Sequence, residues 1–261
     1  MVLIQKLSIL YTMIKVKKSE LSDKVRPFDK QVLECDNETP IPPSPFIGCW
    51  VGPRGAGKST LLCSLLDTPV DEGGLRKRFH TIFAISPTMS HDKKFKRLYD
   101  ELKQDGLHYE DATEANFQEI LNKLKELRDE HPKKQFLLIC DDIVDKLKKS
   151  NSNTLLNHLV LAGRHYGLSM IILSQKFNAI PTLIRNNTEM WCVFNLKNKK
   201  EYQTFLDDMN YPQDQLDKIY KSAVGDGGSS EFLTINSCNC KMRFFKKFNP
   251  LVFTQGEELE S

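Results

Sequence analysis

The chain has 261 residues, enough for one large α/β domain with a modest appendage, and about 40% of them are hydrophobic. Its 37 lysines and arginines nearly balance 34 aspartates and glutamates, so the formal net charge of +3 neither demands nor excludes a nucleic-acid partner. No apolar run is long enough to span a bilayer, and residues 1–12 lack the basic start and the cleavage site of a signal peptide. We therefore expect a soluble protein that is not secreted and has no membrane partner.

The residues before position 46 differ in composition from those that follow. Residues 14–45 are polar and end in the proline-rich run Pro40–Pro45, which predicts a partly irregular N-terminal arm over residues 1–45. Residues 46–261 are predicted to form one domain, with strands at Phe46–Val51, His80–Ser86, Gln135–Cys140, Leu168–Ser174 and Met190–Leu196. Several of these runs are almost continuously apolar, as expected for strands that helices cover on both faces.

Helical patterns lie between the predicted strands. They span Lys58–Leu66, Asp92–Gln104, Glu114–Glu130 and Asn153–Gly163, the last ending on a glycine suited to a C-cap. The alternation of strand and helix predicts an α/β fold with a doubly wound, mainly parallel sheet. Near the C-terminus, Phe232–Ile235 and Lys241–Lys247 predict a β-hairpin that adds antiparallel strands to the sheet edge.

A glycine-rich loop follows the first predicted strand and matches the pattern G-x-x-x-x-G-K-[ST]. The residues expected to surround a bound nucleotide are Gly52, Pro53, Arg54, Gly55, Ala56, Gly57, Lys58, Ser59 and Thr60. Backbone N–H groups of such a loop point inward at phosphate oxygens, and the following helix adds the partial positive charge of its N-terminus. Lys58 is placed to reach the β- and γ-phosphates, and the Ser59 hydroxyl to bind Mg²⁺. The loop therefore predicts ATP and Mg²⁺ as cofactors.

Polar residues end two further predicted strands. Asp141 and Asp142 follow an apolar run, so we expect Asp141 to help hold Mg²⁺ through its water shell. Asp142 would then orient or deprotonate the attacking water, although it could instead only cap the next segment. Gln175 ends the next strand and is predicted to sense the γ-phosphate or position water.

Two arginines are candidates for completing the site of a neighbouring subunit. Arg164 follows a predicted helix and precedes the strand that ends at Gln175, a position near the domain surface. An arginine supplied in trans accelerates phosphoryl transfer by roughly 10³ to 10⁵ where it acts. An ordinary helix-end arginine that binds carbonyl groups is an equally good interpretation of this position. Arg185 is the competing candidate.

Two other functions share parts of this pattern. A small-molecule or nucleoside kinase has the same loop, but no compact arginine-rich lid segment stands out after the Asp-Asp strand. A nucleotide-switched assembly module that reads guanine usually carries Asn-Lys-x-Asp, and Asn198-Lys-Lys-Glu is a poor imitation of it. Both functions remain alternatives to a nucleotide-hydrolysing motor.

The loop, the Asp-Asp strand and the stretch from Gly163 to Asn187 together resemble the poxvirus-type virion DNA-packaging ATPases of large DNA viruses and related mobile elements, within the FtsK–HerA superfamily. The resemblance covers about residues 45–200. It implies an additional-strand, RecA-like P-loop fold in three layers, with the Gln175 strand between the loop strand and the Asp141 strand. Many members of the superfamily carry Glu at the position of Asp142.

The resemblance also implies what the protein does. It suggests a homo-oligomeric ring, hexameric in the family, that pumps double-stranded DNA into a capsid and contacts capsid or portal proteins. The expected location is then the host cytoplasm, in a viral factory, or the virion. The resemblance favours Arg164 as the arginine supplied in trans. The DNA contacts are less clear: the basic and aromatic residues at Lys241–Phe248 could follow DNA phosphates, but their pattern favours an exposed edge strand with solvated lysines.

Overall fold

The computed structural model describes residues 39–143, 154–225, 230–238 and 242–251, all within a unit that spans Cys35–Ser261. Its strands are β1 (Ile47–Val51), β2 (Thr81–Ile85), β3 (His108–Tyr109), β4 (Phe136–Asp141), β5 (Leu168–Ser174), β6 (Met190–Phe194), β7 (Phe232–Asn236), β8 (Arg243–Lys246) and β9 (Asn249–Pro250). Across the described residues they form one nine-stranded sheet in the order β3-β2-β4-β5-β1-β6-β7-β8-β9. The six strands from β3 to β6 are parallel, and the other three join them antiparallel.

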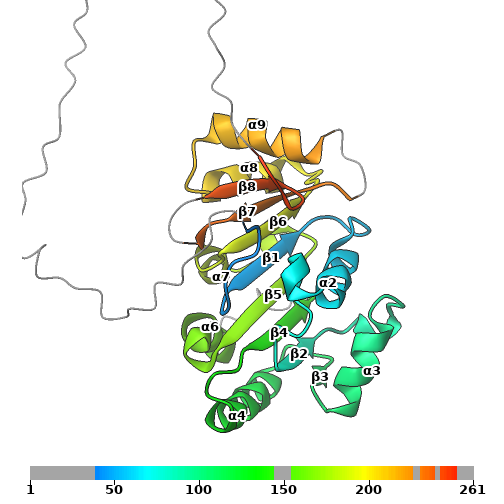
Figure 1. Cartoon of the computed structure of the whole chain (residues 1–261). Helices are drawn as coiled ribbons and strands as arrows, with labels where there is room; N and C mark the ends of the chain where they lie inside the picture. Colours follow the sequence, from blue (N-terminus) through cyan, green and yellow to red (C-terminus); the bar gives the residue numbers. More distant parts are fainter. Residues whose placement is uncertain (1–38, 144–153, 226–229, 239–241, 252–261) are drawn as a thin grey trace, which may run out of the picture. The chain divides into compact units, whose positions relative to one another are not determined.

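Helices cover both faces of the sheet, as Figure 1 shows. They are α2 (Lys58–Asp67), α3 (Lys96–Gln104), α4 (Glu114–Glu130), α6 (Thr154–Ala162), α7 (Thr182–Asn186), α8 (Lys199–Asp208) and α9 (Gln213–Val224). Helices α2 and α3 pack in one apolar cluster, while α4, α6, α7, α8 and α9 pack in the other. Alternate residues of β1 enter opposite clusters, with Trp50 in the first and Cys49 and Val51 in the second. Both faces of the strands are therefore buried, which explains their nearly continuous apolar sequences.

The topology confirms the fold expected from the sequence. All five predicted parallel strands are present within two residues of their predicted ends, and β5 lies between β1 and β4. The predicted hairpin is present as β7 and β8, which pair antiparallel and extend the edge at β6. The boundary predicted between arm and domain at residue 45 stays a prediction, and Ile41 packs in the core before it.

Two helix boundaries differ from the predictions. The helix expected from Asp92 begins at Lys96, because the Asp92 side chain accepts a hydrogen bond from the Lys94 N–H at 3.0 Å and holds a turn there instead. Gly163 does not cap α6 but opens a 3₁₀ turn that runs to Tyr166. The left-handed residue that ends this turn is Gly167, with φ of 71°. Among the described residues, no helix is both long and apolar enough to cross a membrane.

Candidate functional site

The phosphate loop connects β1 to α2 at the carboxyl edge of the parallel sheet. Its first residue, Gly52, donates its N–H to the carbonyl of Ser174 at 3.1 Å, which joins the loop to the end of β5. A Cβ at this glycine would lie 2.5 Å from the Cβ of Phe194 on β6, so no larger residue fits without a shift of the backbone. Gly57 has φ of 107° and directly precedes α2. The local sequence therefore bends the chain sharply between a strand and a helix N-terminus.

Lys58 is folded back into this loop. Its ammonium group donates to the carbonyl oxygens of Gly52 at 2.6 Å and Pro53 at 3.1 Å. Burial lowers the pKa of Lys58, while the nearby carboxylates of Asp142 and Asp141 raise it. The side chain is buried to 8% exposure, so the loop holds a largely desolvated cation at its centre. Such a cation is well suited to bind a phosphate oxygen.

Asp141 lies across the cavity from the loop, at the end of β4. Its Oδ2 accepts hydrogen bonds from the hydroxyl of Ser86 at 3.2 Å and the hydroxyl of Thr88 at 3.4 Å. Burial, reinforced by the neighbouring charge of Asp142, raises its pKa to about 6. Two hydroxyl groups thus orient a carboxylate that the fold makes costly to ionise, and a bound cation would offset that cost.

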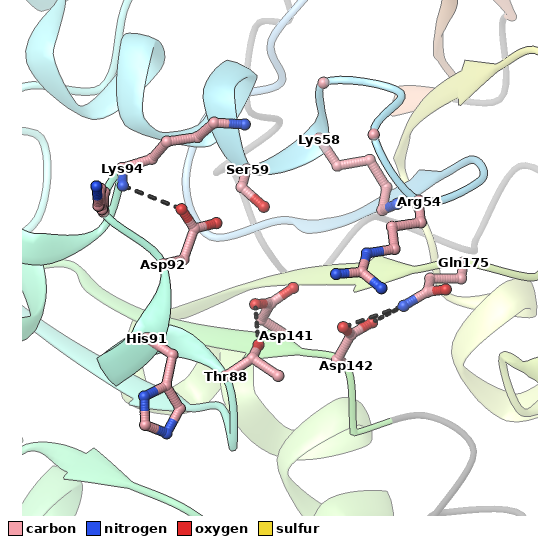
Figure 2. A pocket seen from close by; sticks show the side chains of 13 residues that line it. Arg54, Lys58, Ser59, Thr88, His91, Asp92, Lys94, Asp141, Asp142 and Gln175 are labelled. Carbon is pink, nitrogen blue, oxygen red and sulfur yellow. Dashed lines mark hydrogen bonds between the residues drawn. The ribbon is translucent and has the colours of Figure 1, made fainter.

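Asp142 and Gln175 form a pair at the ends of β4 and β5. The amide nitrogen of Gln175 donates to both carboxylate oxygens of Asp142, at 2.9 and 3.1 Å. Asp142 has φ of 52°, in the left-handed region that Asp tolerates better than most residues. Figure 2 shows the pair beside Arg54 and Lys58, on the opposite side of the cavity from Asp92. The sequence predicted both residues but not their contact.

These side chains line one open cavity of about 820 Å³. Of the predicted residues, the structure brings together Arg54, Gly55, Gly57, Lys58, Ser59, Asp141, Asp142 and Gln175 around it. Gly52 and Pro53 do not line the cavity, and their carbonyl groups accept the hydrogen bonds of Lys58. Ala56 and Thr60 do not line the cavity, and Thr60 is exposed on α2.

The sequence interpretation missed the far wall of the cavity, which the segment between β2 and α3 supplies. The residues that it contributes are Thr88, His91, Asp92, Lys93 and Lys94. A signal was present, because Ser86 and Thr88 follow an apolar strand in the same way that the two aspartates follow theirs. The carboxyl ends of neighbouring parallel strands meet at one edge.

The two candidate arginines have different environments. Arg164 is exposed in the turn before β5. Because β5 runs from that turn toward the cavity, Arg164 lies at the amino ends of the parallel strands, on the opposite side of the sheet from its own cavity. Arg185 is only 14% exposed, forms an ion pair with Asp208 and lies 5.4 Å from the centroid of the Phe177 ring. Arg185 is therefore engaged within its own domain, whereas Arg164 is available at the surface.

The residues around the cavity fit a magnesium nucleotide. Lys58 and the loop provide a cation and backbone donors for phosphate, and Arg54 adds a second cation on the cavity wall. Ser59 and Asp141 provide the hydroxyl and carboxylate oxygens that Mg²⁺ prefers, and in Figure 2 both side chains face the cavity. ATP and Mg²⁺ as the cofactors of this chain stay a prediction, with which these side chains are compatible.

The sequence also matches known proteins. It fits the family described as Poxvirus A32 protein over residues 39–220. The DNA packaging protein OPG160 of Variola virus is 32% identical over 164 residues, and the same values hold for that of Vaccinia virus (strain Copenhagen). The aligned region is 58% of this chain and 54% of each relative, so the chain spans about half the length of the curated relatives that it matches.

Solved structures are similar in fold. The genome packaging NTPase B204 from Sulfolobus turreted icosahedral virus 2, in complex with AMPPCP, has a TM-score of 0.54 and 15% identity, and covers 80% of this chain and 99% of its own. Its complex with ATP-gammaS has a TM-score of 0.52 and 14% identity, and covers 80% of this chain and 98% of its own. Because the family match covers well over half of the chain, this protein belongs to the poxvirus A32 family, and the resemblance inferred from its sequence is confirmed.

Proposed function

We propose that this protein hydrolyses ATP and uses the reaction to move double-stranded DNA into a viral capsid. The observation that carries the proposal is the convergence of Lys58, Asp141 and the Asp142–Gln175 pair on one cavity at the carboxyl edge of the sheet. The relatives described as DNA packaging proteins and genome packaging NTPases supply the context of packaging.

In this proposal, each side chain acts through the contacts described above. Lys58 exchanges its two carbonyl partners for oxygens of the β- and γ-phosphates; Ser59, and Asp141 through the water shell, would hold a magnesium ion. The ion, when bound, neutralises charge on the phosphates and so lowers the barrier to attack. Asp142 accepts a hydrogen bond from the attacking water and takes its proton. Gln175 restrains the Asp142 carboxylate, just after β4, by donating to both of its oxygens.

We further propose that the active form is a homo-oligomeric ring, hexameric in keeping with the family, in which Arg164 enters the cavity of the adjacent subunit. The exposed side chain at the opposite edge of its own sheet supports this role, because it cannot serve its own cavity. The engaged state of Arg185 argues against the competing candidate. Double-stranded DNA and capsid or portal proteins are the proposed partners, in the host cytoplasm or the virion.

An ATPase assay with and without long double-stranded DNA tests the proposal. We expect DNA to stimulate phosphate release, and Lys58→Ala to reduce the rate by at least about 10²-fold, because the loss removes a charge contact to the transition state. Lys96→Ala is the matched control, since Lys96 is exposed on α3 and does not line the cavity. Transfer of phosphate to a nucleoside, or a rate of ATP hydrolysis that DNA does not change, would contradict the proposal that the protein is a DNA motor.

Mixed assemblies test the trans arginine. Subunits with Lys58→Ala and subunits with Arg164→Ala are each expected to be inactive when alone. When mixed, some interfaces combine an intact loop with an intact arginine, so partial activity returns. Arg185→Ala subunits serve as a comparison. Absence of recovery in mixed rings that demonstrably form, as judged by mass, contradicts the role proposed for Arg164.

A further inference from the structure

A second hollow lies at the β3 end of the sheet. It has a volume of about 530 Å³ and is bounded by α3 on one side, α4 on the other, and the start of β2 at its base. None of its lining residues lines the nucleotide cavity. This edge groove, as we call it, therefore belongs to a different part of the domain.

The edge groove exposes an unpaired strand edge. Strand β3 has only two residues and pairs with β2 at Ala84 and Ile85 alone. The N–H groups of Ala84 and Ser86 donate to the carbonyls of Leu107 and Tyr109, and strand alternation points the polar backbone groups of Ile82 to the same side. Within the described ranges, no strand pairs with Ile82 on that side. Ile82 is half-buried and lines the groove.

The walls of the edge groove combine apolar and acidic side chains. Leu98 and Leu127 are half-buried and face it from α3 and α4. Glu126, Glu130 and Asp105 are exposed on its rim, and none of the three has an ion pair or a side-chain hydrogen bond in the part of the chain that the structure describes.

The remaining charged side chains of the groove are already engaged. Glu101 lies 3.8 Å from Arg97, and Lys123, which lines the groove together with His80, is paired with Glu119 at 2.9 Å. The groove is therefore strongly acidic, with several carboxylates left to bind an incoming cation.

We propose that the edge groove binds an extended segment of a partner protein in which apolar residues alternate with lysine or arginine. The segment adds as a strand beside β2, and its backbone bonds to Ile82. Its apolar side chains contact Leu98 and Leu127, and its basic side chains contact Glu126 and Glu130. Edge strands pair readily with such segments, and the acidic rim selects a basic one.

Titration with a designed peptide tests whether the edge groove binds such a segment. The probe is a fluorescein-labelled peptide, Thr-Lys-Val-Lys-Val-Lys-Thr, blocked at both ends and titrated into the full chain at low salt with anisotropy as the readout. The matched control is the same peptide with N-methylated valines, which lacks backbone donors. We expect the probe to bind and the methylated peptide to bind at least ten times more weakly, because strand addition depends on main-chain hydrogen bonds.

Variants of the chain identify where the probe binds. Ile82→Pro removes the unpaired N–H without removing a ladder bond, as proline does on sheet edges, and we expect at least tenfold weaker binding. Ile82→Val keeps the N–H and should bind normally. Replacing Glu126 and Glu130 by Gln should weaken binding about fivefold at low salt, an effect that high salt removes. An unchanged ATPase rate in each variant shows that the fold is intact.

Two outcomes overturn the proposal. The first is equal affinity of the probe for the original chain and for Ile82→Pro, or no binding at millimolar peptide. The second is self-association of the chain, seen by sedimentation, that Ile82→Pro abolishes and the peptide does not compete with. That result would make a second copy of the chain the occupant of this edge. Neither result bears on ATP hydrolysis, so the test is independent of the proposed function.

Discussion

The buried carboxylate of Asp141 should lower the stability of the protein in the absence of a ligand. Its exposure is 6%, and it lies beside Asp142, so the folded state resists its ionisation. The variant Asp141→Asn keeps the shape of the side chain and an oxygen that accepts from Ser86 and Thr88. We therefore expect the variant to fold more stably than the original chain while losing the oxygen best placed to hold a cation.

The magnitude follows from the pKa. The folded state raises the pKa of Asp141 from 3.8 to about 6, and each pKa unit corresponds to about 1.4 kcal/mol. A carboxyl with a raised pKa contributes stability that is present below its unfolded pKa and lost as the pH rises through the folded one. At pH 7.5 the variant should therefore be more stable by about 3 kcal/mol, and at pH 5 by about 1.5 kcal/mol. Near pH 4 the difference should fall below about 1 kcal/mol.

Urea unfolding of both proteins at several pH values, with EDTA and without nucleotide, measures the difference. The expected gain at pH 7.5 corresponds to about 6–10 °C in melting temperature for a chain of this size. Asp105→Asn is the control, because that carboxylate is exposed and remote from the cavity, and its replacement should change stability by less than about 0.5 kcal/mol. An Asp141→Asn protein that is no more stable at pH 7.5, or whose advantage persists at pH 4, would refute the reasoning.

Three further variants test other contacts. Gly52→Ala places a Cβ 2.5 Å from a side chain of β6, so it should lower stability by about 1–3 kcal/mol and abolish nucleotide binding, as calorimetry can show. Gln175→Ala releases the Asp142 carboxylate and should lower kcat by roughly 10-fold to 100-fold with little change in KM, as steady-state kinetics can show. Arg185→Ala leaves Asp208 without its partner and should lower stability by about 2 kcal/mol in a urea titration.

The strands were predictable because their environment is uniform. A strand such as β4 is buried at all six residues, so its sequence is apolar until the chain reaches the cavity at Asp141. The loop was predictable for a related reason, since the tight bend at Gly52 and the helix start at Lys58 tolerate few residue types. In the strand and in the loop alike, the residue types that the local sequence supplies are those that the local structure demands.

Helices α8 and α9 were missed although their sequences carry helical signals. Leu216, Ile219 and Ala223 of α9 recur at helical spacing and are buried, and α8 buries Phe205 and Leu206. The side chain of Asn198 caps α8 by accepting from two backbone N–H groups. Asn198 thus has an ordinary role at a helix start, although the sequence Asn198-Lys-Lys-Glu superficially resembles a base-reading motif.

The half of the site formed by the β2–α3 segment illustrates a different limit. Each strand's end can be located from its own sequence, but which ends become neighbours depends on the order of strands in the sheet. Here β4 pairs with β2 on one side and with β5 on the other, which brings Thr88 to Asp141 and Gln175 to Asp142. The family resemblance predicted that β5 lies beside β4, but it did not predict that β2 lies on the other side of β4. The position of β2 beside β4 arises from packing between residues more than fifty positions apart, and no local pattern in the sequence encodes it.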